Sequence, residues 1–170
     1  MAEKNLLEAF LKAEELEIQG KEFYLDASEK AHIPSVKDLF KQLAEAEEFH
    51  RIKIREIYQT FQAKKNIPAY VTKISQKQIS PVFDPKEIEK VASVVTDLAA
   101  LEEALRLEEK SIQYYQSLSD KSKDLKVKRF LLALIQEEWG HYLSIFDTME
   151  FLRDPSSWYT FKEHWGLEGV

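Results

Sequence analysis

Residues 47–50 read Glu-Glu-Phe-His, and residues 138–141 read Glu-Trp-Gly-His. In each stretch a glutamate and a histidine are three residues apart, so on a helix both side chains lie on one face. Apolar residues flank each pair at helical spacing, four residues before the glutamate and seven residues after it. These flanking residues are Leu43, Ile54, Leu134 and Ile145. The two stretches therefore predict two helices that each direct a carboxylate and an imidazole into the protein interior.

The two stretches belong to an internal repeat with an offset of 91 residues. Twelve of the forty-two residues in the range 13–54 are identical to the residue 91 positions later. The identical positions include one further glutamate in each copy, Glu17 and Glu108, which stands thirty residues before the glutamate of the Glu-x-x-His motif. They also include Tyr24 and Tyr115, seven residues after those glutamates. The repeat predicts two copies of one helical hairpin.

Helical periodicity extends over most of the chain. Apolar residues recur at steps of three, four or seven in four segments, which are 5–31, 35–64, 84–118 and 122–152. Asn5, Ser35 and the pair Asp84-Pro85 have the residue types that begin helices, and we expect them to start the first three. Segment 65–84 interrupts the pattern and is long enough to return the chain along a bundle. The sequence predicts an all-α four-helix bundle over 1–152, with this crossover between the second and third helices.

The last part of the chain, residues 153–170, is a short segment rich in aromatic residues. It contains Trp158, Tyr159, Phe161 and Trp165. Large aromatic side chains contribute much to the stability of a core or an interface when they are buried, because each removes a large apolar area from water. We therefore expect this segment to dock on the bundle or on a partner chain.

Six polar residues of the repeat create an electrostatic problem if they face the bundle core. Buried carboxylates without a partner are costly or remain protonated, and no lysine or arginine stands at the equivalent positions. Two divalent metal ions would balance four carboxylates, and oxygen and imidazole ligands suit iron or manganese. One glutamate from each of two helices, with Glu-x-x-His from each of the other two, is a known ligand pattern for such a metal pair. The predicted ligands are Glu17, Glu47, His50, Glu108, Glu138 and His141.

Composition excludes several other classes of protein. The 170 residues include no cysteine, which rules out thiolate zinc sites, cysteine-bound iron–sulfur clusters and disulfides. The formal net charge of −6 argues against a nucleic-acid-binding protein. No apolar stretch is long enough to span a membrane, and the N-terminus lacks the layout of a secretion signal. We expect a cytoplasmic protein.

These residues resemble the rubrerythrin branch of the ferritin-like superfamily. The resemblance covers about residues 5–152 and includes Glu17-Ile-Gln-Gly-Lys-Glu-Phe-Tyr24, its counterpart over 108–115, and the ending Asp154-Pro-Ser-Ser-Trp158. It implies a ferritin-like bundle in which the six residues above bind two iron ions, with manganese or a mixed pair as alternatives. Either Glu47 and Glu138, or Glu47 and Glu108, would be the bridging carboxylates.

Two features differ from rubrerythrins. Full-length rubrerythrins carry a rubredoxin-like module with four cysteines that supplies electrons, so this chain would need a separate electron-donor protein. They also usually have an additional glutamate one turn after the ligand of the third helix, where this chain has Ser111. The six-ligand set is therefore also similar to that of bacterioferritin, whose site oxidises ferrous iron.

The resemblance implies a di-iron oxidoreductase that reduces hydrogen peroxide or dioxygen, and we expect a homodimer. A ferroxidase or iron-handling protein is one alternative, and a metal-stabilised interaction module without turnover is another. Tyr24 and Tyr115 are candidates for bonding the ligand carboxylates or relaying an electron beside the metals. Their alternative interpretation is as ordinary core aromatic residues.

Overall fold

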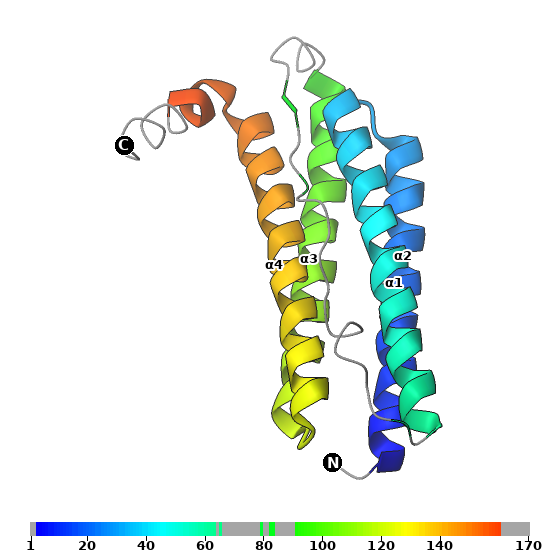
Figure 1. The fold of residues 1–170 in the computed structure, drawn as a ribbon. Coiled ribbons are helices and arrows are strands. Elements are labelled where there is room, and N and C mark those ends of the chain that lie inside the picture. The colour runs from blue at the N-terminus through cyan, green and yellow to red at the C-terminus, as the bar shows by residue number, and fades with distance from the viewer. Residues whose placement is uncertain (1–2, 64, 66–78, 80–81, 84–90, 161–170) are drawn as a thin grey trace.

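Four long helices make up the described part of the computed structural model, which comprises residues 3–63, 65, 79, 82–83 and 91–160. The helices are α1 (Glu3–Lys30), α2 (Pro34–Gln62), α3 (Val91–Lys121) and α4 (Leu125–Arg153). Figure 1 shows α1 and α2 as one antiparallel hairpin, with the hairpin of α3 and α4 beside it. No strand occurs among the described residues. The all-α four-helix bundle expected from the sequence is confirmed.

Two predicted helix starts are wrong, and one lies outside the described residues. Asn5 is inside α1, which already includes Glu3, because charged residues of good helix propensity extend the helix beyond it. Helix α2 begins at Pro34, whose fixed φ suits the first helical position, so Ser35 lies inside the first turn. The predicted start at Asp84 lies outside the described residues, and the described part of α3 begins at Val91.

A tertiary contact holds the start of α2 where no local side chain caps it. Ile33 occupies the N-cap position and makes no side-chain capping bond. The carboxylate of Asp97 on α3 instead accepts hydrogen bonds from the backbone N–H groups of His32 (3.1 Å) and Ile33 (2.9 Å). Asp97 is itself almost fully buried. The negative charge also lies at the positive end of the α2 dipole, which favours this arrangement.

The second hairpin turns three residues later than the sequence suggests. Helix α3 continues to Lys121, past the predicted end at Leu118, and α4 starts at Leu125 rather than near Ser122. Asp124 is the N-cap of α4, and its side chain accepts hydrogen bonds from the backbone N–H groups of the second and third residues after it. An acid at this position satisfies two of the N–H groups that every helix start leaves without a partner.

The apolar core consists of two clusters, one toward each end of the bundle. On α1 the first cluster includes Phe10 and Ala13, and the second begins at Tyr24. On α4 the first cluster ends at Ile135, and the second begins at Ile145. Between these positions each of the four helices buries at least one glutamate, with Leu16 and Ala46 as buried apolar neighbours. The bundle therefore has a charged layer in the middle of its core.

The described part of the C-terminal segment lies against the end of α4. Residues 155–160 are helical, and the indole N–H of Trp158 donates a hydrogen bond to Asp147 at 2.9 Å. The Trp158 ring meets Phe151 with a centroid distance of 5.4 Å and Phe83 with one of 4.9 Å. Phe161 and Trp165 lie outside the described residues, as does most of the crossover 65–84. No helix in the described part of the chain has the length and apolar character needed to cross a bilayer.

Candidate metal centre

The middle layer of the core contains all six residues that the sequence singles out as ligands. Helix α1 contributes Glu17, and α3 contributes Glu108. Helix α2 contributes Glu47 and His50, and α4 contributes Glu138 and His141. All six are buried, with exposed fractions between 0% and 5%. The four helices thus bring one acid each, and two of them an imidazole as well, to one place.

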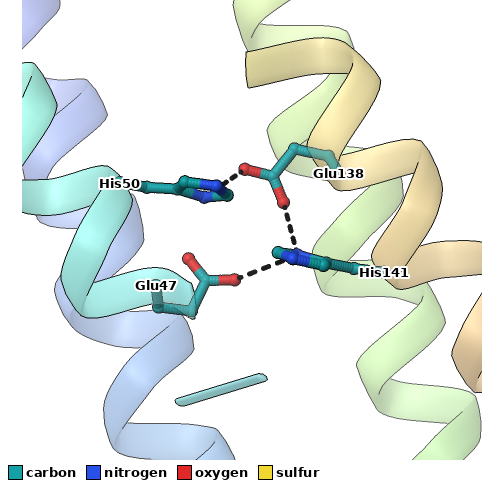
Figure 2. Close-up of side chains that lie close together, drawn as sticks. All are labelled: Glu47, His50, Glu138 and His141. Carbon is teal, nitrogen blue, oxygen red and sulfur yellow. Dashed lines mark hydrogen bonds and ion pairs between the residues drawn. The ribbon is translucent and has the colours of Figure 1, made fainter. Parts of the chain in front are cut away.

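The two Glu-x-x-His motifs face each other across the bundle, as Figure 2 shows. Each of the four side chains offers one ligand atom, and these atoms all lie within 4.8 Å of one another. Glu138 lies between the two imidazoles, with its Oε1 3.1 Å from Nδ1 of His50 and its Oε2 3.2 Å from Nδ1 of His141. Oε1 of Glu47 approaches the same nitrogen of His141, at 3.9 Å.

The glutamates of α1 and α3 complete the cluster in a symmetric way. Oε2 of Glu17 is 3.4 Å from Nδ1 of His50, and Oε2 of Glu108 is 3.8 Å from Nδ1 of His141. Each histidine therefore lies beside the glutamate of its own hairpin. The two imidazole rings are nearly parallel, with centroids 5.3 Å apart. The internal repeat of the sequence thus appears in space as an approximate twofold arrangement.

Two buried tyrosines connect the hairpins at this layer. The hydroxyl of Tyr24 donates a hydrogen bond to Oε1 of Glu108, and the hydroxyl of Tyr115 donates one to Oε1 of Glu17. Each tyrosine therefore bonds the glutamate of the other copy of the repeat. Because a hydroxyl has one proton to donate, each bond fixes one carboxylate oxygen and leaves the other directed at the cluster.

Burial and crowding of negative charge shift the acids of the metal-free cluster. Burial raises the pKa of Glu17 and the pKa of Glu47 well above the ordinary carboxyl value. The charges of Glu138 and Glu108 raise both further, although a hydrogen bond with Glu47 partly offsets the rise at Glu17. Burial and the charge of Glu138 raise the pKa of Glu108 to about 7. These acids therefore resist ionisation as long as no cation lies among them.

Glu138 and the two histidines behave in the opposite way. Burial acts to lower the pKa of His50, but Glu138 outweighs it and raises this pKa to about 9. At His141 burial is likewise outweighed by Glu108 and Glu138, and the pKa rises to about 10. Burial acts to raise the pKa of Glu138, yet the two imidazoliums hold it well below its usual range. In the absence of metal, protons on the imidazoles thus provide the positive charge.

The hydrogen-bonding of the cluster is incomplete in a way that fits a metal pair. The buried atoms without a hydrogen-bond partner are Oε2 of Glu17, both ring nitrogens of His50, Oε2 of Glu108 and Oε1 of Glu138. The 3.1 Å contact of His50 with Glu138 has the distance of an ion pair but not the direction of a hydrogen bond. Unsatisfied buried polar atoms are rare and costly. Their concentration here, with carboxylate and imidazole donors, suits iron or manganese.

The chain matches the family model described as Rubrerythrin over residues 5–149. This chain belongs to the rubrerythrin family. A solved structure of a hypothetical protein from Pyrococcus furiosus is also similar, with 28% sequence identity and a TM-score of 0.66. The alignment covers 88% of this chain and 90% of that one. No curated protein matches the chain.

Family membership and the buried cluster together support a di-iron type of protein whose glutamates and histidines are compatible with a pair of metal ions. This rubrerythrin-family chain has no cysteine, and the part that the structure describes is helical, with no rubredoxin module evident. Trp139, between the two residues of the second motif, is about half exposed and packs against Tyr142 rather than filling the cluster.

Sequence reasoning missed two residues close to the cluster. Glu14 is buried one turn before Glu17 and pairs with Arg51 at 3.2 Å and with Arg55 at 2.7 Å. The spacing of three residues indicated that Glu14 and Glu17 share one face of their helix. Only the packed helices show that two arginines of α2 neutralise Glu14. Gly20 is the other: a Cβ atom there would lie 3.2 Å from Cδ of Glu47, so the glycine makes room for that carboxylate.

Proposed function

We propose that this rubrerythrin-family chain is a di-iron oxidoreductase that reduces hydrogen peroxide to water with electrons from a separate donor protein. The observation that carries the proposal is the buried cluster of four carboxylates and two imidazoles, which has several donor atoms without hydrogen-bond partners. Such a cluster does not stabilise the fold by itself, since buried charges cost more than they return without excellent pairing. It has the composition of a site that binds and uses metal ions.

The contacts support a division of the ligands between two ions. Glu17 and His50 would bind one ion, and Glu108 and His141 the other, because each pair lies together in its own hairpin. Glu138 is in contact with both imidazoles, which favours it as a carboxylate shared by both ions. The repeat gives Glu47 the equivalent position. The contacts of Glu138, together with the place of Glu47 in the repeat, favour Glu47 and Glu138, rather than Glu47 and Glu108, as the pair that would hold both ions.

The proposed reaction takes up two electrons and two protons per molecule of peroxide, breaks its O–O bond and releases two molecules of water. When bound, two iron ions supply the electrons and act as Lewis acids toward the developing oxide. The side chains of the protein bury the site and fix the carboxylates: Tyr24 holds one oxygen of Glu108, and Tyr115 holds one oxygen of Glu17. Because the chain has no cysteine, the electrons would arrive from another protein.

A ferroxidase function is the second candidate, and Ser111 is the observation that favours it. This serine stands one turn after Glu108, where rubrerythrins usually have a seventh carboxylate. The remaining six-ligand set resembles that of bacterioferritin, whose site oxidises ferrous iron. A ferroxidase that serves iron storage requires a large hollow shell of subunits, whereas a peroxide-reducing enzyme does not.

Anaerobic loading with ferrous iron followed by rapid mixing tests the proposal. We expect two irons per chain and oxidation of the diferrous form by peroxide at least about tenfold faster than by an equal concentration of dioxygen, a difference of about 1.4 kcal/mol in barrier. Zero or one iron per chain would contradict both functions. Faster oxidation by dioxygen, together with a shell-sized assembly on size-exclusion chromatography, would favour the ferroxidase.

A further inference from the structure

A small cavity lies between α1 and α3, directly beside the carboxylate cluster. Its volume is about 20 Å³. Its lining includes three pairs of residues that are 91 positions apart and so occupy equivalent places in the two copies of the repeat. These pairs are Leu16 with Leu107, Gln19 with Lys110, and Gly20 with Ser111. The cavity is therefore built by the contact of the two hairpins, at the point where equivalent residues meet.

The cavity connects the surface with the cluster. Gln19 and Lys110 are exposed and mark its outer end. Glu47, Glu108 and Tyr24 also line it and are buried, so they mark its inner end. Glu47 is the most exposed of the six cluster residues, at 5%. A molecule in the cavity would thus touch carboxylates of the cluster on one side and reach solvent on the other.

Small side chains keep this space open. Gly20 has no side chain, and a Cβ atom there would already lie 3.2 Å from Cδ and 3.4 Å from Oε2 of Glu47. Its equivalent in the second copy, Ser111, has one of the smallest side chains and is half-buried against the same space. A longer side chain at position 111 would project into the cavity.

The volume of the cavity limits what can pass. A site needs about 10–15 Å³ of this kind of volume for one water molecule, so 20 Å³ accommodates one or two bonded heavy atoms. Hydrogen peroxide and dioxygen have two heavy atoms and fit this limit. An alkyl hydroperoxide would also have to place its carbon atoms where Leu16 and Leu107 stand.

We propose that this cavity is the route by which the oxidant reaches the metal pair, and that it selects hydrogen peroxide or dioxygen over organic hydroperoxides. The inference rests on the proposed function, since it concerns the access of a substrate to the same cluster. It assigns Ser111 and Leu107 a role in substrate selection.

The substitution Ser111→Leu tests the route, because it fills the cavity and leaves all six predicted ligands in the chain. We expect the variant to retain two irons per chain, while its reduced form binds nitric oxide, a probe of two heavy atoms, at least about tenfold more slowly than wild type. Peroxide oxidation should slow by a similar factor. The matched control is Gln113→Leu, an exposed position on the same helix, where both rates should remain those of wild type. Wild-type rates in a fully loaded Ser111→Leu protein would overturn the inference.

The substitution Leu107→Ala tests selection by widening the cavity instead of filling it. It remains a test of the proposal even if the Ser111→Leu protein does not fold. Widening the cavity should raise the rate with tert-butyl hydroperoxide by about tenfold or more relative to the rate with hydrogen peroxide. The control is Leu105→Ala, a half-buried leucine of α3 that does not line the cavity. An unchanged ratio of the two rates in the Leu107→Ala protein would contradict selection by this cavity.

The proposed function and the proposed route can be contradicted separately. If the wild-type protein binds two irons and nitric oxide but does not reduce peroxide, the proposed function is wrong, and the nitric oxide rates still test the route. If peroxide is reduced and Ser111→Leu has no effect, the function stands and the route is wrong.

Discussion

At the scale of single residues, the proposed function depends on acids that water would ordinarily surround. Glu138 is fully buried between two imidazoles, with contacts of 3.1 and 3.2 Å. In this place a carboxylate is tolerated only with a positive partner. In the metal-free protein the partners are the protons on the two imidazoles, and in the proposed loaded protein they would be two metal ions. The metal affinity of a variant therefore shows whether the replaced residue binds the ions or only lies near them.

Replacement of Glu138 by glutamine should abolish the metal pair. The amide has the same shape but no charge, so we expect fewer than two irons per chain and a loss of affinity beyond the roughly 10–100-fold seen for residues that only support a ligand. Metal analysis after anaerobic loading and gel filtration measures this. The matched control is Glu137→Gln on the same helix, which should keep two irons; full loading of Glu138→Gln would refute its assignment as a ligand.

Adjacent tyrosines of α3 provide a matched pair of variants. Tyr115 bonds Glu17 in the cluster, whereas Tyr114 bonds the backbone carbonyl of Ala9 at 2.8 Å, away from the cluster. Each change to phenylalanine removes one hydrogen bond and should cost about 1 kcal/mol of unfolding free energy. Only Tyr115→Phe should also weaken metal binding, by about 10–100-fold, as measured by competition with a chelator. Equal metal affinity in the two variants would contradict a supporting role for Tyr115.

At the scale of elements, each hairpin is built by local rules but positioned by contacts from the other. The start of α2 is an example, because its N-cap side chain makes no bond and Asp97 of α3 accepts the backbone N–H groups instead. Asp97 thereby joins the second hairpin to the first at one end of the bundle. The tyrosine–glutamate bonds join them again in the middle layer.

Replacement of Asp97 by alanine should destabilise the bundle by about 1–3 kcal/mol, because it leaves backbone N–H groups at the start of α2 without an acceptor. Urea denaturation of the metal-free protein measures the change. Glu102→Ala is the control, since Glu102 is an exposed acid on α3 whose ion pair with Arg153 should contribute less than about 1 kcal/mol. Equal stability of the two variants would show that the Asp97 contact does not hold the hairpins together.

At the scale of the whole molecule, two apolar clusters enclose one charged layer. The apolar clusters provide the driving force for folding, and the layer between them reduces it unless its charges are balanced. The approximate twofold symmetry places equivalent acids in the same layer. The stability of the bundle should therefore depend on what balances this layer.

The metal-free protein should become less stable as the pH rises from 6 to 9. The pKa values of Glu108 (about 7), His50 (about 9) and His141 (about 10) all lie above the unfolded values of 4.5 and 6.5, so the folded state binds more protons in this range. Linkage then requires that stability present at low pH is lost as the pH rises through these values. The lowered pKa of Glu138 has no influence here, because this acid is ionised in both states above pH 6.

Thermal unfolding of chelator-treated protein at pH 6 and pH 9 measures this effect. The iron-loaded protein is the control, because metal ions displace the protons and should flatten or reverse the dependence. A higher melting temperature at pH 9 than at pH 6 in the metal-free protein would contradict this account of the layer.

The sequence by itself determined the bundle, the six clustered residues and their pairing in two copies. Helical periodicity and the three-residue spacing of Glu47 and His50 are local properties, so residues close in sequence suffice to place them on one face. The 91-residue repeat then related the second motif to the first. Expectations based on local capping at Asn5 and Ser35 were wrong, because neighbouring residues and a distant acid decide where those helices start.

Only the tertiary structure decided which residues of one hairpin meet which residues of the other. The bonds from Tyr24 to Glu108 and from Tyr115 to Glu17 span 84 and 98 residues. The cavity at Gly20 and Ser111 likewise exists only where α1 and α3 come together. Such contacts depend on how two packed helices are positioned and rotated relative to each other. No local pattern specifies that, because it follows from the packing of the whole core.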